Sequence, residues 1–255
     1  MSKYGTKWSD EETIIAFYYY CRLPFGKLTK TNPEIIRIAT LLGRTPSSVV
    51  LKMCNLAHFD PEMQKRSVKG MSNASKTDSA IVARFFENWE ELTYEAQQIE
   101  TMLTAGESPQ KPDLEQLPSG NTIDQVVKAR INQDFFREAV LSSYQGRCCI
   151  TGINVPTLLI ASHIKPWKDS DPNTERTNPS NGLCLNALHD RAFDQGLITV
   201  LPDFTVRVSS LLNQRGGDDS TAWLRQCDKQ KIQLPGKFIP AKHFLEYHND
   251  VIFVP

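Results

Sequence analysis

The stretch Ala161–Ile198, "ASHIKPWKDSDPNTERTNPSNGLCLNALHDRAFDQGLI", decides the fold of the second half of the chain. The β-rich run "TLLIASHI" predicts a strand that holds His163 near its end, and a polar loop follows it. "NGLCL" predicts a second strand, and the Asn-Gly before it suits a tight turn. "ALHDRAFDQG" predicts a short helix that ends at Gly196. A strand–loop–strand–helix unit of this size cannot bury much core, so a metal or surrounding elements must support it.

His163 has two interpretations. It is either an incidental histidine in a packed hairpin or the base of a small metal site that cuts phosphodiester bonds. Such hydrolysis needs a base for the attacking water and a cation on the phosphate and the leaving oxygen. Asn181 can fix the loop or orient the histidine, while His189 and Asp190 place an imidazole and a carboxylate on the helix. This combination favours the metal site.

Composition excludes several classes of protein. The chain has 255 residues, of which 40% are hydrophobic, enough for one large or two modest domains. It has no apolar run approaching the roughly 18 residues that a membrane span requires, so we expect no membrane association. The 6 cysteines include no C-x-x-C pair, which argues against a structural zinc site or a disulfide scaffold. We therefore expect a reduced, cytoplasmic protein.

The net charge of zero conceals a pattern along the chain. Residues 1–76 carry 12 Lys and Arg against 6 Asp and Glu, whereas residues 77–119 carry 2 against 9. A basic first module followed by an acidic segment is compatible with one surface that faces DNA. Ordinary solvated surface charge is the alternative.

The N-terminal module predicts helices with clear start and stop signals. The first helix spans Trp8–Arg22, with Ser9 as its cap and Ile14, Phe17 and Cys21 on one face. A second helix begins after Asn32 and ends at Gly43, and a third follows Thr45 almost at once. Two helices joined across "GRTP" are typical of a helix-turn-helix.

The third helix would show short polar side chains and a lysine on one face, which suits contacts to phosphates and base edges. A solvated face on a helical domain that touches no DNA is the alternative. The candidate DNA-binding residues here are Arg44, Ser48, Lys52 and Asn55.

Residues 105–121 lack apolar periodicity and predict a linker. The expected domains are therefore a helical recognition domain over 1–104, which includes a helix running through Phe85 to Leu92, and a second domain over 122–255.

The second domain should open with a helix that ends at Gly146 and turns Phe135, Ala139 and Tyr144 inward. "CCIT" then predicts a short strand. An exposed polar face on this helix could meet DNA phosphates or be ordinary surface. Its members are Arg130, Gln133 and Arg137.

Residues 127–255 resemble the HNH nucleases, in the subgroup associated with bacterial restriction. The resemblance lies in "RINQDFFREAVL", "CCITG", "SHIKPW", "NPSNGLCL", "HDRAFDQGLI" and "FIPAKHFLEYHNDVIF", in that order. It implies that His163 is the general base and Asn181 the middle residue of the motif. The last motif position falls about nine residues after the asparagine, which points to Asp190, although His189 keeps the letter of the motif. The segment before residue 60 also looks like a module found in front of such nucleases.

The resemblance implies a divalent metal, with Mg²⁺ first and Mn²⁺ as an alternative. Many HNH enzymes carry an acidic ligand directly before the first histidine, and Ser162 stands there instead. Ser162 then contributes weakly, or Asp194 or another carboxylate substitutes, or water supplies most ligands, an arrangement that Mg²⁺ tolerates. Lys165 is positioned in sequence to approach a phosphate.

These observations predict an α+β protein with a helical N-terminal domain containing a helix-turn-helix and a C-terminal ββα-metal nuclease domain. The expected function is a restriction-type DNA endonuclease, specific for a sequence or a modification, that acts on double-stranded DNA as a homodimer. A DNA-binding regulator with an inactive HNH-like domain and a nuclease of broad specificity are the alternatives.

Overall fold

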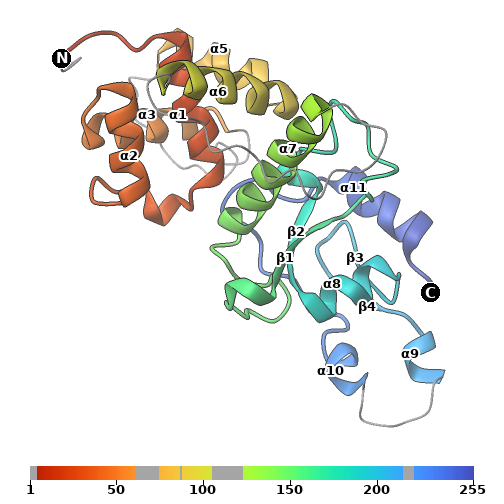
Figure 1. Ribbon diagram of the computed structural model, residues 1–255. Coiled ribbons are helices and arrows are strands. Elements are labelled where there is room, and N and C mark those ends of the chain that lie inside the picture. The colour runs from red at the N-terminus through yellow and green to blue at the C-terminus, as the bar shows by residue number, and fades with distance from the viewer. Residues whose placement is uncertain (1–4, 61–74, 87, 105–122, 215–220) are drawn as a thin grey trace. The chain divides into compact units, whose positions relative to one another are not determined.

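The chain folds into two compact units, Met1–Phe135 and Phe136–Pro255. The structure is a computed structural model and describes residues 5–60, 75–86, 88–104, 123–214 and 221–255 (Figure 1). The expected linker at 105–121 lies outside the described residues. The division between the units falls inside helix α7, Ile123–Ser143.

The first unit is helical. Its capping signals act as the sequence predicts: Ser9 forms a capping box with Glu12, Asn32 accepts a hydrogen bond from the backbone of Glu34, and Gly43 adopts a left-handed φ of 65°. Besides the first part of α7, the helices are α1 (Asp10–Arg22), η1 (Phe25–Lys27), α2 (Pro33–Leu42), α3 (Pro46–Ala57), α5 (Lys76–Phe85) and α6 (Trp89–Leu103).

The expected single helix through Phe85 to Leu92 is wrong, because α5 ends at Phe85 and α6 begins at Trp89. Asn88 explains the break. Its side-chain amide donates a hydrogen bond to the carbonyl of Arg84, and its own φ and ψ of −128° and 57° are not helical. Asparagine side chains compete for backbone groups in this way and interrupt helices.

Aromatic rings fill the core of the first unit. Phe17 on α1 stacks on Trp89 with ring centroids 6.2 Å apart, and Phe135 packs against both Tyr18 and Trp89. Phe135 is buried, as the inward position predicted for it requires, and the rings that it contacts belong to the first unit.

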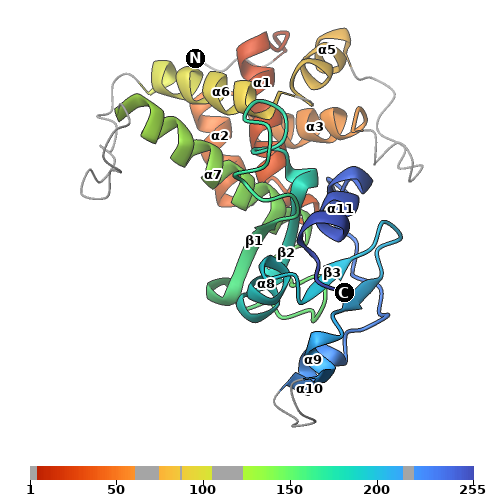
Figure 2. The same ribbon diagram turned by 90° about the vertical axis from the view of Figure 1, so that its right-hand side faces the viewer.

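The second unit is built on the predicted hairpin and helix. Strands β1 (Leu159–His163) and β2 (Gly182–Asn186) pair antiparallel, with His163 opposite Gly182, and helix α8 (Ala187–Asp194) follows β2 directly (Figures 1 and 2). A second hairpin and short helices complete the unit: η3 (Pro156–Leu158), η4 (Pro179–Asn181), β3 (Ile198–Val200), β4 (Val206–Val208), α9 (Leu211–Gln214), α10 (Ala222–Arg225), α11 (Lys242–Tyr247) and the π-helix η6 (His248–Ile252).

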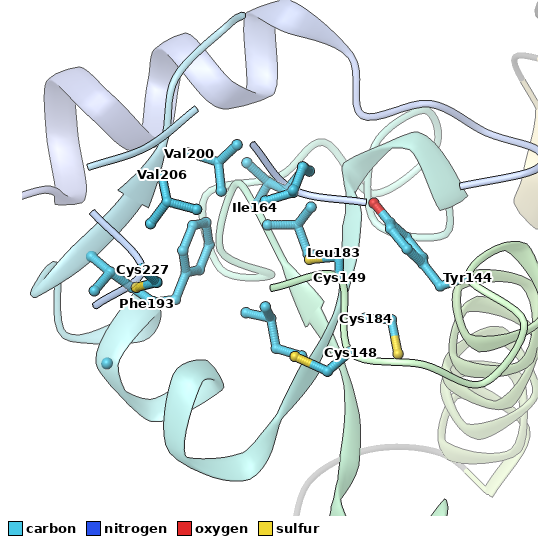
Figure 3. Close-up of a cluster of buried hydrophobic side chains, with 14 of the residues drawn as sticks. Tyr144, Cys148, Cys149, Ile164, Leu183, Cys184, Phe193, Val200, Val206 and Cys227 are labelled. Atoms are coloured by element: carbon cyan, nitrogen blue, oxygen red, sulfur yellow. The ribbon is translucent and has the colours of Figure 1, made fainter. Parts of the chain in front are cut away.

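The expected strand at "CCIT" is wrong, because this segment is a turn. The amide of Gly152 donates to the carbonyl of Cys148, and Gly152 has a φ of 73°, so the chain reverses before a strand can extend. Cys148 and Cys149 are nonetheless buried in the core of the unit (Figure 3).

The core of the second unit supports the hairpin and α8 from one side. Figure 3 shows Phe193 of α8 beside Val200 and Val206 of the second hairpin, with Leu183 of β2 in the same cluster. This apolar cluster supplies the burial that a ββα unit lacks by itself.

Candidate active site

A cavity of about 460 Å³ lies between β1, the loop that follows it, α8 and η6. The polar, charged and aromatic side chains in its lining are Ser162, His163, Trp167, Lys168, Asp190, Asp194 and His248. Strand β1 and helix α8 are the first and last elements of the predicted ββα unit, and β2 lies between them in the chain. The cavity therefore brings together His163 and Asp190 of the sequence motif.

His163 is held rigidly in this cavity. Its ring stacks on Phe136 with centroids 3.8 Å apart and an interplanar angle of 10°, and Trp167 contacts it edge-on at 5.6 Å. The imidazole Nε2 lies 2.9 Å from the carbonyl oxygen of Arg176.

This hydrogen bond determines the tautomer of His163. A carbonyl oxygen can only accept, so Nε2 carries the hydrogen, and in the neutral ring Nδ1 keeps its lone pair. Burial lowers the pKa of His163 below 6.5, and the bond to the Arg176 carbonyl only partly offsets this. At neutral pH the side chain is therefore an unprotonated imidazole that can accept a proton, as a general base requires.

Asn181 is fully buried and holds the loop between the strands. Its Oδ1 accepts from the backbone amide of Lys165 at 2.8 Å, and its Nδ2 donates to the carbonyls of Lys165 and Glu175 and to the hydroxyl of Ser170. Because Glu175 precedes the residue whose carbonyl binds His163, these bonds also fix the partner of the imidazole. Asn181 does not line the cavity, so it acts as a positioning residue.

Two carboxylates from α8 share the cavity. Asp190 and Asp194 are four residues apart and so lie on one face of the helix. Burial raises the pKa of Asp190, an effect that the neighbouring Ser162 hydroxyl opposes. Burial also raises the pKa of Asp194, and repulsion from Asp190 raises it further. Two carboxylates that repel each other in a partly buried site are stabilised by a cation between them.

The donor set fits a hard divalent cation. The residues that the structure describes contain no group of three or more His, Cys, Asp or Glu side chains arranged around a metal. The cavity instead offers two carboxylates and the buried hydroxyl of Ser162, which are oxygen donors. Mg²⁺ and Mn²⁺ prefer oxygen, and Mg²⁺ is commonly held by one or two carboxylates with water completing its shell.

His189 points elsewhere. Its ring is 3% exposed, lies 5.2 Å from Trp223 in an edge-on contact, and does not line the cavity. Its Nδ1 lies 3.0 Å from Nδ2 of Asn186, the residue that caps α8. Adjacent helical residues are rotated by roughly 100° about the helix axis, and here Asp190 lines the cavity whereas His189 does not. The imidazole predicted as a ligand packs in the interior instead.

The lysine that lines the cavity is Lys168, whereas the sequence predicted Lys165. Lys165 pairs with Glu175, with Nζ 2.6 Å from the carboxylate oxygen, and both side chains are about one-fifth exposed. Lys168 is exposed and lines the cavity. Lys168 escapes prediction from the sequence because "HIKPWKD" contains two lysines, and only the path of the loop distinguishes them.

The candidate DNA contacts of the first unit have internal partners. Arg44 pairs with Glu12 at 2.6 Å, and Lys52 pairs with Asp78 at 2.6 Å, with side chains only 4% and 8% exposed. The expectation of an exposed face is therefore wrong for Lys52, and Arg44, which precedes α3, is bound to a carboxylate of its own unit. Ser48 and Asn55 line a separate cavity in this unit, together with the Lys52–Asp78 pair.

The polar face expected on α7 is exposed as predicted, at Arg130, Gln133 and Arg137. Arg137 also donates a hydrogen bond to the carbonyl of Leu159 at 2.9 Å, at the start of β1.

Within the described residues, no helix is both long enough and apolar enough to cross a membrane.

Comparison with known families finds one match. Residues 148–201 match the family model described as HNH endonuclease. The matched segment contains β1, the loop, β2 and α8, and with them His163, Asn181, Asp190 and Asp194. A comparison with curated proteins gives no match.

Proposed function

We propose that the protein is a metal-dependent DNA endonuclease with His163 as its general base, because residues 148–201 match the HNH endonuclease family model. The observation that carries this proposal is the shared cavity. Its lining contains an imidazole whose Nε2 faces a carbonyl oxygen, two carboxylates from α8, and the exposed lysine Lys168.

The side chains have distinct roles in phosphodiester hydrolysis. His163 accepts a proton at Nδ1 from the attacking water, while the Arg176 carbonyl holds its Nε2–H and stabilises the imidazolium that results. Asp190 and Asp194 would hold the cation, and Lys168 contacts a phosphate oxygen of the substrate strand. A bound divalent cation supplies charge stabilisation at the scissile phosphate and the leaving oxygen.

We further propose that the substrate is double-stranded DNA and that the enzyme has a restriction-type role. The support is the separate helical unit, in which α2 and α3 are joined by three residues, as in a helix-turn-helix. The excess of Lys and Arg over residues 1–76 gives this part of the chain the charge that attracts phosphates.

Digestion of supercoiled plasmid tests the proposal. Methylated and unmethylated plasmids are incubated with the purified protein in Mg²⁺, in Mn²⁺ and in excess chelator. We expect cleavage only with a metal, and a difference between the two plasmids if the enzyme reads modification. Binding of DNA without cleavage under every condition would identify a regulator with an inactive domain, and cleavage of all nucleic acids alike would identify a nuclease of broad specificity.

A further inference from the structure

A second cavity of about 460 Å³ lies in the first unit, separate from the HNH segment. It is bounded by the residues just before α1, by α3 and by the start of α5. The lining residues that matter here are Lys7, Trp8, Ser48, Leu51, Lys52, Asn55 and Asp78. The face of α3 that the sequence predicted as a DNA contact therefore forms a wall of a concave site.

The charges around this cavity cancel in pairs. Lys52 is bonded to Asp78 inside the cavity, and Arg44 is bonded to Glu12 beside it. Both cations also lie 4.9 Å from the centre of the Trp8 ring, so cation–π contacts hold the indole in place. The walls are thus close to neutral, and Lys7 is an exposed cation in the lining.

One hydrogen-bonding group of the cavity has no partner among the residues that the structure describes. The Oδ1 atom of Asn55 is buried and accepts no hydrogen bond from them. A buried acceptor without a donor costs free energy, and native proteins rarely leave one without a reason. A ligand N–H group placed in the cavity would satisfy it.

The lining also offers apolar surface to a ligand. Leu51 is 45% exposed although it is a large aliphatic side chain, and with Trp8 it forms an apolar wall. The cavity therefore favours a flat, uncharged ring with an N–H on its edge, attached to an anionic group near Lys7. A zwitterionic amino acid fits poorly, because Lys52 and Asp78 already neutralise each other.

We propose that this cavity binds a nucleobase of a DNA strand, with its N–H edge on Asn55 and its backbone phosphate near Lys7. This proposal rests on the proposed function only in taking the nucleobase to belong to DNA. In this arrangement the base leaves the stack and is read inside the first unit, so recognition is separate from the cavity that contains His163.

Binding measured in excess chelator tests this without any cleavage. The full chain is titrated with a fluorescent single-stranded oligonucleotide of mixed sequence and with a strand of the same length composed of abasic units. We expect the base-bearing strand to bind at least about 10-fold more tightly, because stacking and one satisfied acceptor favour it. Equal affinity for the two strands would overturn the proposal, whatever the nuclease activity.

Variants localise the effect. Asn55→Leu should weaken binding of the base-bearing strand by about 10-fold and leave the abasic strand unchanged. Leu51→Glu should weaken binding of the base-bearing strand more than Ile36→Glu does, and the fold tolerates it because Leu51 is exposed. Ile36→Glu on α2 is the matched control, because this substitution adds the same charge. Ile36 is also 45% exposed, and it lies outside the cavity. Unchanged binding in Leu51→Glu, or equal loss in Ile36→Glu, would contradict the assignment.

Free nucleotides distinguish the source of the base. Each of the four deoxynucleoside monophosphates is titrated separately, and competition with the labelled strand is recorded. Competition that Leu51→Glu abolishes would support the cavity as a base site. Binding of a nucleotide in the direct titration, with no binding of the labelled strand, would assign the cavity to a free nucleotide and overturn the proposal of a DNA strand. Failure of every nucleotide and strand to bind would overturn the proposal.

Discussion

The imidazole of His163 acquires its chemistry from its neighbours. Phe136 stacks on one face, Trp167 closes the edge, and the Arg176 carbonyl binds Nε2. Burial lowers its pKa and the hydrogen bond selects the tautomer. The imidazole is thus a neutral proton acceptor in the folded protein, as the proposed role of general base requires.

Replacement of this base should nearly abolish cleavage. His163→Ala is expected to lower the cleavage rate by about 10²–10⁴-fold, the usual contribution of a general base, while DNA affinity persists. Plasmid nicking and filter binding measure the two quantities. His243→Ala is the control, since His243 is exposed on α11 and does not line the cavity. Near-normal cleavage by the folded His163→Ala variant would remove the residue from the mechanism.

The pH dependence of cleavage should reflect the lowered pKa of His163. The imidazole must be neutral to accept a proton, so activity falls as pH drops through its pKa in the folded protein. Because burial lowers that pKa, we expect the acidic midpoint of the rate profile to lie below 6.5. In Trp167→Ala, which exposes the ring to water, the midpoint should move up towards 6.5. A wild-type midpoint at or above 6.5 would contradict the role of burial.

Asp190 and His189 provide a test of the motif register. Asp190→Asn removes a charge from the cavity and should raise the metal concentration required for half-maximal cleavage by about 10-fold or more. His189→Gln should change the metal requirement little and act on stability instead, because its ring packs against Trp223. Metal titrations of both variants decide between them. A changed metal requirement in His189→Gln alone would assign the site to the other residue.

At the scale of elements, α8 is positioned by the turn that ends it. Gly196 has a φ of 67°, and a Cβ there would lie 2.1 Å from the carbonyl oxygen of Ile252 in η6. The close approach places η6 against the end of α8, and both elements contribute walls to the cavity. A larger residue would force them apart.

Two glycines with similar backbone angles separate strain from steric overlap. Gly146 has a φ of 65°, and a Cβ added there would meet nothing within 4 Å, so Gly146→Ala should cost only the left-handed conformation, about 1–2 kcal/mol of unfolding free energy. Gly196→Ala adds the overlap with Ile252 and should cost about 1–3 kcal/mol more. Denaturant unfolding of both variants measures the difference. Equal destabilisation would show that η6 can move away freely.

At the scale of the molecule, one cavity meets one phosphodiester bond. A double-strand break therefore needs two sequential nicks or two protomers, and a two-fold dimer would present two His163 residues to opposite strands of a palindromic site. We expect a homodimer on DNA whose affinity falls steeply as salt rises, because phosphate contacts release counterions. Sedimentation of the protein on its cleavable duplex across a salt series tests this. A monomeric complex that produces only nicks would leave a nicking enzyme.

The sequence alone determined the order and limits of the main elements around the site. The hairpin with His163 at its end, the helix that follows it, and the caps at Ser9, Asn32 and Gly43 all depend on residues within a few positions of one another. Local hydrogen bonds and periodicity fix such features, so they can be predicted from the chain. The failures at "CCIT" and at Asn88 arose where a polar or glycine turn overrode apolar periodicity.

Only the tertiary structure decided which side chains share the cavities. Arg44 is paired with a residue 32 positions away and Lys52 with one 26 positions away, so Lys52 is not exposed on the face where the sequence placed it. Asp190 faces the cavity and His189 does not, because packing of α8 on the core sets its rotation. Contacts between distant segments fix these orientations, and a pattern read along one element carries no information about the surface packed against it.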